Sequence, residues 1–91
     1  MPKIIYTASY NRRAVAFLKK HPELKNQYSK TLQLLELNPR HPSLKLHELK
    51  GKHAELHSVA INLSFRISIY FIIHEEIVIP VDLGSHVELY K

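Results

Sequence analysis

The sequence predicts an α+β domain in which an N-terminal strand is followed by a helical hairpin packed on one face of a small, mostly antiparallel sheet. Three observations support this fold class. Apolar residues recur at helical spacing as far as Leu35, their period changes to two from residue 55 onward, and turn residues separate the segments. Helices followed by strands are typical of a two-layer sandwich. The 91 residues are enough for a single domain, 1–91, with its own core.

The first two predicted elements are a strand and a helix. Residues 3–7 favour a short strand. The hydroxyl of Ser9 or Thr7 can then cap a helix over residues 10–20, because it accepts a hydrogen bond from the free N–H groups of the first turn. The pair His21-Pro22 ends this helix.

A second helix is predicted to begin with Pro22 at its first position, where the missing N–H costs nothing. It ends at Asn38-Pro39. The apolar faces of the two helices are expected to consist of Ala14, Phe17, Leu18, Leu24, Tyr28, Leu32 and Leu35.

Three strands are predicted after a short extended segment at residues 45–49. Turns are expected at residues 62–64 and 74–76. The rows that face the helices are expected to be His57, Val59, Ile61 and Leu63, then Ile67, Ile69, Phe71 and Ile73, then Ile77, Ile79, Val81 and Leu83. Pro80 cannot donate to a ladder, so it should lie at a bulge or where a neighbouring strand is missing.

The opposite face of the sheet is expected to be exposed to water, since an antiparallel sheet can leave one face uncovered. It carries Ser58, Ala60, Arg66, Ser68 and Tyr70. The tail with Val87, Leu89 and Tyr90 is expected to dock on the domain, with His86 at the rim of the docking site. Alternatively, His86 is a solvated turn residue.

The chain is basic, with 13 Lys and Arg against 8 Asp and Glu, a formal charge of +5 and a pI near 9.6. This charge favours a polyanion or an acidic protein as partner. The alternative is a basic face that is only solvated. The cations and histidines of the middle segment are Arg40, His41, Lys45, His47, Lys50, Lys52, His53 and His57.

Several classes of protein are excluded by simple counts. The chain has no cysteine, which excludes disulfides and thiolate metal sites. Its longest apolar stretches are too short to span a bilayer, so we expect a cytoplasmic protein without a membrane partner. His53 and His57 would be about 13 Å apart on a strand. No HExxH motif is present, and neither a metal nor another cofactor is predicted.

The remaining chemistry that these residues fit is RNA cleavage without a metal. A 2′-hydroxyl attacks the adjacent phosphate when a base removes its proton, an acid protonates the leaving oxygen and a cation stabilises the phosphoryl charge. His47 and His86 suit the acid and base roles, and Arg66 suits the clamp. Tyr90 can stack on a base.

The same side chains also have a structural interpretation. His47 would then be an ordinary surface residue, Arg66 would pair with Glu55 or Asp82, and Tyr90 would fill the core. Convergence of these side chains on one face would favour the chemical interpretation.

Three segments of the chain resemble the RelE/ParE toxin superfamily, most closely its YafQ-like mRNA interferases. They are His47-Glu48-Leu49-Lys50-Gly51-Lys52, Phe65-Arg66-Ile67-Ser68-Ile69-Tyr70 and Leu83-Gly84-Ser85-His86-Val87-Glu88-Leu89-Tyr90. The resemblance implies the toxin of a type II toxin–antitoxin system, a ribosome-dependent endoribonuclease that cuts mRNA, inhibits translation and is neutralised by an antitoxin. It implies the catalytic residues His47, Arg66, His86 and Tyr90. The RNA-binding residues would be Arg40, Lys45, Lys50, Lys52, His53 and His57.

The chain departs from the YafQ-like pattern at three positions. Ala60 and Ser64 stand where the pattern has a histidine and an aspartate, and His53 stands where it has an aromatic residue. Either Arg66, His57 and His53 share this work, or the activity is weak or lost. The gyrase-poisoning ParE branch, which shares the fold without this chemistry, is the alternative function, and a non-catalytic basic module that binds RNA or protein is another.

Overall fold

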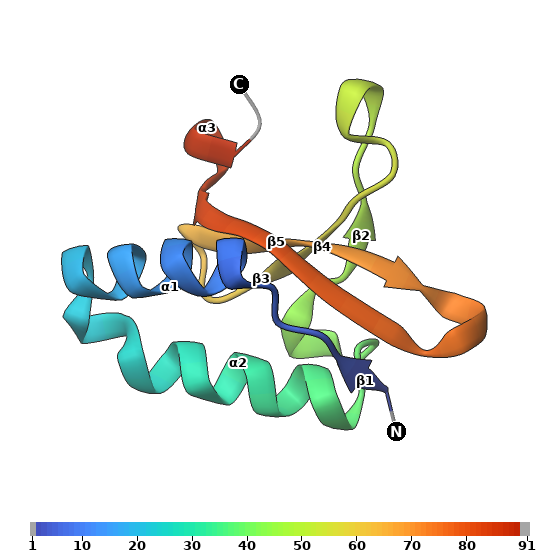
Figure 1. Cartoon of the computed structure of the whole chain (residues 1–91), viewed down its shortest axis with the longest axis horizontal. Coiled ribbons are helices and arrows are strands. Elements are labelled where there is room, and N and C mark those ends of the chain that lie inside the picture. Colours follow the sequence, from blue (N-terminus) through green and yellow to red (C-terminus); the bar gives the residue numbers. More distant parts are fainter. Residues whose placement is uncertain (1, 90–91) are drawn as a thin grey trace.

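Two helices, α1 (Ala8–Lys20) and α2 (Lys25–Leu37), form a hairpin on one face of a five-stranded sheet (Figure 1). The structure is a computed structural model that describes residues 2–89. The strands are β1 (Lys3–Ile4), β2 (His47–Glu48), β3 (His57–Ala60), β4 (Phe65–Ile72) and β5 (Ile77–Ser85), and a short helix, α3 (His86–Leu89), follows them. The connections contain the 3₁₀ turns η1 (Pro22–Leu24), η2 (Pro42–Leu44), η3 (Gly51–His53) and η4 (Ile73–Glu75). The predicted α+β architecture is confirmed.

The strand order in the sheet is β1-β5-β4-β3-β2. Only β1 runs parallel to its neighbour, and the other pairs are antiparallel. The register between β4 and β5 shifts by one residue, because Ser68 pairs with Asp82 whereas Ile69 pairs with Pro80. Val81 is therefore an extra residue that bulges from β5.

Pro80 lies where its missing N–H group costs the sheet no hydrogen bond to β1. It adjoins the bulge, and β1 ends at Ile4, which pairs with Val78, so no β1 residue reaches Pro80. The expectation that this proline lies at a bulge or beside a missing neighbour is confirmed.

The same bulge makes the predicted apolar row of β5 wrong. Val78, Pro80, Leu83 and Gly84 are the buried residues of this strand, and the first three of them face the helices. Ile77 and Ile79 instead pair with Ile72 and Tyr70 on the opposite face. Strict alternation cannot hold across an extra residue, since each side chain beyond it changes face.

The two helices begin and end close to where their sequence signals predict. The Thr7 side chain accepts a hydrogen bond from the Tyr10 N–H at 3.0 Å and caps α1, which starts at Ala8, two residues earlier than expected. His21 ends it, and Pro22 begins the 3₁₀ turn η1 rather than α2 itself. The first strand is shorter than expected and ends at Ile4.

Two residues expected in the core lie outside it. Leu63 is 88% exposed and Ile73 is 49% exposed, because each lies in a turn just beyond the strand whose alternation it continues. The turn before β4 is held by Asn62, whose Oδ1 accepts hydrogen bonds from the N–H groups of Ser64 and Phe65 at 2.9 and 2.8 Å.

The sheet face opposite the helices is less exposed than predicted. Ser58, Ala60 and Ser68 are buried at its centre. These side chains are short, and α3 packs against β4 and β5 beside them. The predicted docking of the tail is wrong for Val87, which is 68% exposed, whereas Leu89 is half-buried. Tyr90 lies outside the described residues.

A buried pair of hydroxyls joins the two helices. Tyr10 on α1 is 1% exposed, and its Oη lies 2.7 Å from the Oη of Tyr28 on α2. Burial raises the pKa of both tyrosines, so the pair is neutral and one hydroxyl donates to the other.

We expect Tyr28→Phe to lower the free energy of unfolding by about 1–3 kcal/mol, because the Tyr10 hydroxyl is left buried without its partner. The double variant Tyr10→Phe/Tyr28→Phe should lose less than the sum of the two single variants. Urea unfolding measures the free energy of unfolding of the two single variants and of the double variant. Tyr70→Phe, at an exposed position, is the control, and strictly additive losses would contradict coupling between the two hydroxyls.

Candidate functional site

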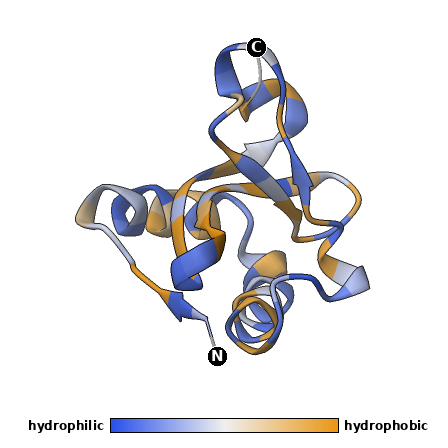
Figure 2. Cartoon of the chain, turned by 90° about the vertical axis from the view of Figure 1, so that its right-hand side faces the viewer, coloured by the Kyte–Doolittle hydropathy of each residue, from blue (hydrophilic) through white to orange (hydrophobic). Residues whose placement is uncertain are grey.

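Two segments rise from the sheet on the side away from α1 and α2 (Figures 1 and 2). One is the finger, residues 47–57, which comprises β2, η3 and the start of β3. The other is α3. We call the sheet surface on this side the open face; by register it carries His47, Ser58, Ala60, Arg66, Ser68, Tyr70 and Gly84.

The register brings three predicted catalytic residues to this side of the molecule. Arg66 lies between Ala60 on β3 and Gly84 on β5. His47 pairs with Ser58 at the neighbouring position, so it shares the face with Arg66. His86 begins α3 two residues after Gly84 and is exposed. His47, Arg66 and His86 therefore lie on one side of the sheet, whereas Tyr90, the fourth predicted catalytic residue, lies outside the described residues.

Arg66 carries a buried donor that no described residue satisfies. Its Nη1 is buried without a hydrogen-bond partner among residues 2–89. The expected alternative partner, Asp82, instead forms an ion pair with Arg13 of α1 at 3.0 Å. A buried N–H group without a partner is costly. Arg66 belongs to the open face by register and also lines a cavity, so its guanidinium is suited to bind an anion that enters this cavity.

The ring of His47 has a defined tautomer. Its Nδ1 lies 3.0 Å from the backbone oxygen of Lys45. A carbonyl oxygen can only accept, so Nδ1 carries the proton and the neutral ring has its lone pair on Nε2. His47 is therefore oriented to act as a base through Nε2.

A capping box fixes the start of α3. The Ser85 hydroxyl accepts from the Glu88 N–H, and the Glu88 carboxylate accepts from the Ser85 N–H, both at 3.2 Å. Gly84 precedes this box with φ +158, and a Cβ at that position would lie 3.4 Å from the Glu88 Cβ. A contact at that distance is an ordinary one, so it is the positive φ, which other residues rarely adopt, that favours glycine here.

The residues predicted to bind RNA fall into two groups. Lys50, Lys52 and His53 lie on the finger, where the two lysines are exposed and His53 is half-buried. Lys45 lies between η2 and β2 and lines a cavity with Arg66. These four residues lie on or beside the open face.

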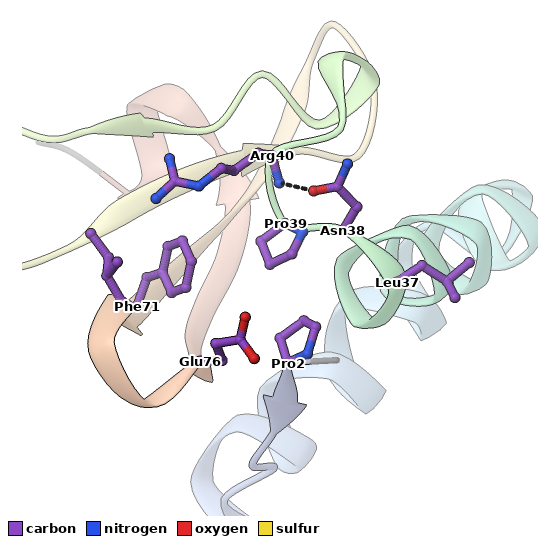
Figure 3. Close-up of a pocket in the computed structure, with 8 residues that line it drawn as sticks. Pro2, Leu37, Asn38, Pro39, Arg40, Phe71 and Glu76 are labelled. Carbon is purple, nitrogen blue, oxygen red and sulfur yellow. Dashed lines mark hydrogen bonds between the residues drawn. The ribbon is translucent and has the colours of Figure 1, made fainter.

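Arg40 and His57 lie on the helix side of the sheet, where they line a cavity of about 170 Å³ together with His47. The Arg40 guanidinium is 5.7 Å from the ring centre of Phe71, beside a separate cavity of about 360 Å³ (Figure 3). His57 contacts Phe71 edge-on, with its Nε2 4.0 Å from a Glu48 oxygen. His57 directly precedes Ser58 in β3, so alternation turns it away from the open face.

The sequence interpretation did not identify two amide side chains near Arg66. Gln27 and Asn62 line a cavity of about 320 Å³ together with Arg66 and Lys45. Asn62 lies in a predicted turn next to the strand of Arg66, so the sequence could have indicated that it lies near this arginine. Gln27 belongs to α2, and only the packing of this helix brings it to the cavity.

Residues 2–89 contain no group of three or more His, Cys, Asp or Glu side chains arranged to hold a metal ion. None of the helices in that range is long and apolar enough to cross a membrane.

Comparison with known proteins identifies the fold. No family model and no curated protein matches the sequence. The chain has the fold of small bacterial toxins of the RelE/ParE type. YafQ from E. coli strain BL21(DE3) superposes with a TM-score of 0.79 at 15% identity over the full length of both chains.

Two further solved structures share this fold. In the E. coli DinJ-YafQ toxin-antitoxin complex, a chain matches with a TM-score of 0.76 at 17% identity, covering 99% of this chain and 98% of its own. The YoeB/ParE toxin from Agrobacterium tumefaciens gives 0.71 at 15% identity, covering 92% and 98%. The predicted likeness to RelE/ParE toxins is confirmed at the level of the fold, which YafQ and the YoeB/ParE toxin both share.

The capping box makes the order of α3 depend on pH. Hydrogen bonds from the Ser85 backbone N–H and then its side chain lower the pKa of Glu88 below its usual 4.5. A carboxylate with a lowered pKa stabilises the fold above that usual value, and the stabilisation is lost as the pH falls through the lowered pKa. We expect the Ser85 amide signal to change below about pH 4.5 in NMR titrations. Glu88→Gln should abolish this change of the Ser85 signal. If the change persists in the variant, the titration of another group causes it.

Proposed function

We propose that this protein is the toxin of a type II toxin–antitoxin system and a metal-independent endoribonuclease that cleaves mRNA on the ribosome. The observation that carries the proposal is the open face, which by register carries both Arg66 of β4, with its unpaired buried Nη1, and His47 of β2. His86 stands at the end of the same face. The fold shared with YafQ supports the assignment.

The proposed reaction uses these three side chains. Nε2 of His47 takes the proton of a ribose 2′-hydroxyl, whose oxygen attacks the adjacent phosphorus. Arg66 binds the phosphoryl oxygens, where negative charge develops. The bond to the 5′-oxygen breaks, and that oxygen receives a proton from His86. The products are a 2′,3′-cyclic phosphate and a 5′-hydroxyl end.

Ala60 and Ser64 stand where the YafQ-like pattern has a histidine and an aspartate, so other residues must supply the chemistry of those two side chains. Ala60 lies directly opposite Arg66, and its small side chain leaves room beside the guanidinium. Ser64 is exposed in the turn before β4. Of the three residues expected to take over from the missing histidine and aspartate, Arg66 lies on the open face, whereas His57 is on the helix side. We therefore assign the charge stabilisation to Arg66.

The proposed partners follow from the charge of the chain and from its structural relatives. The formal charge of +5 suits an acidic antitoxin, and E. coli YafQ has been solved in complex with DinJ. Exposed Lys50 and Lys52 on the finger suit phosphates of mRNA and rRNA. Tyr90 keeps its proposed role of positioning a base.

The two histidines provide the main test. His86→Gln and His47→Asn retain hydrogen bonding without proton transfer, and the Asn amide can still donate to the Lys45 carbonyl. We expect mRNA cleavage to fall by about 10²–10⁴ in each variant. The measurement is the mapping of mRNA 5′ ends after induction in cells, with growth recorded in parallel.

A matched control is His74→Gln, in the hairpin between β4 and β5, which should cleave like the wild type. If His86→Gln stays toxic, leaves mRNA intact and blocks DNA replication as the wild type does, the ribonuclease proposal fails. The gyrase-directed alternative would then replace it.

Arg66→Lys tests the phosphate clamp. Lysine keeps the charge but not the planar fork that binds two oxygens at once, so we expect normal folding and loss of most cleavage. Circular dichroism and the same mapping of 5′ ends measure the two effects. Arg12→Lys, on the exposed part of α1, should change neither, and full activity of Arg66→Lys would refute the clamp.

A further inference from the structure

A cavity of about 320 Å³ opens beside Arg66 at the edge of the open face. Its polar lining comes from Arg66, Lys45, Ser43, Gln27 and Asn62. The volume is at the lower end of the range for small-molecule sites and suits one nucleobase. Because the unpaired Arg66 Nη1 belongs to a residue of this lining, a phosphate bound by Arg66 would bring its nucleotide to the cavity.

Asn62 is held in one orientation by the turn before β4. Its Oδ1 already accepts the N–H groups of Ser64 and Phe65, at 2.9 and 2.8 Å. The Nδ2 group, which can only donate, remains available to an occupant. Arg66 and Lys45 also only donate, whereas Gln27 and Ser43 can donate or accept, so donors predominate in the lining and favour a ligand with acceptors.

Lys45 connects the cavity with the proposed base. Lys45 is part of the cavity lining, and its backbone oxygen accepts a hydrogen bond from Nδ1 of His47. Lys45 adopts the left-handed conformation, φ 49, and its N–H donates to the Pro42 oxygen of the preceding turn. Lys45 therefore links the cavity to His47, which itself lines a separate, smaller cavity.

We propose that this cavity holds the base of the nucleotide on the 5′ side of the cut, and that Asn62 Nδ2 donates to a carbonyl acceptor of that base. The proposal rests on the proposed function. The attacking 2′-hydroxyl belongs to this nucleotide, whose ribose lies between His47 and the phosphate on Arg66. Guanine O6 and uracil O4 are acceptors where adenine and cytosine carry amino donors, so the site favours guanine or uracil.

Asn62→Asp is the test substitution. It keeps the oxygen that accepts from Ser64 and Phe65 but replaces the donor Nδ2 with an acceptor. Among mapped cuts, we expect the ratio of guanine and uracil to adenine and cytosine on the 5′ side to fall about tenfold. Asn38→Asp is the matched control, because Asn38 Oδ1 accepts from the Arg40 N–H in a similar turn at the other cavity (Figure 3).

A titration that does not depend on cleavage gives a second readout. We expect the Asn62 side-chain NH₂ signals to shift in NMR spectra with 3′-GMP or 3′-UMP, less with 3′-AMP or 3′-CMP, and not with inorganic phosphate alone. Identical shifts with phosphate and with all four nucleotides would overturn the base site. An unchanged ratio in Asn62→Asp, with active cleavage, would also overturn it, whereas absence of cuts by the wild type would refute the proposed function instead.

Discussion

An extra residue in one strand, Val81 in β5, is the constraint on which the arrangement of the open face depends. Before the bulge, Val78 and Pro80 face the helices, and after it Leu83 does so. Because of this shift, the residues on both sides of the bulge can be buried against the helices while Gly84 still pairs with Arg66. A β5 without the bulge would exchange the faces beyond Pro80, so the core and the site could not both form.

The helices were predictable because their signals are local. Thr7 as cap, Pro22 as a stop and Asn38-Pro39 as an end act within one or two turns. The bulge was not predictable in position, because it arises from pairing with β4, although the missing N–H of Pro80 indicated it. Exposure of Leu63 was missed because alternation continues in the sequence after β3 has ended.

The candidate site was predictable in part for the same reason. Alternation along β3 and β4 placed Arg66 on the face opposite the helices, as found. The basic composition of the middle segment grouped Arg40 and His57 with the finger lysines, but charge carries no information about faces, and both lie on the helix side. Gln27 reaches the cavity only through the packing of α2, which no local pattern contains.

The position of β5 inside the sheet has a consequence for how the chain folds. β1 pairs with β5 in parallel, so the strand made early in synthesis has no partner until Ile77 and Val78 exist. Such pairing between distant segments slows folding, because a long loop must close before any contact forms. The finger is a local pairing of β2 with β3, whereas α3 follows β5 in the chain and can pack on the sheet only after β5 has been made. A nascent chain therefore has no complete open face until β5 and α3 have been made.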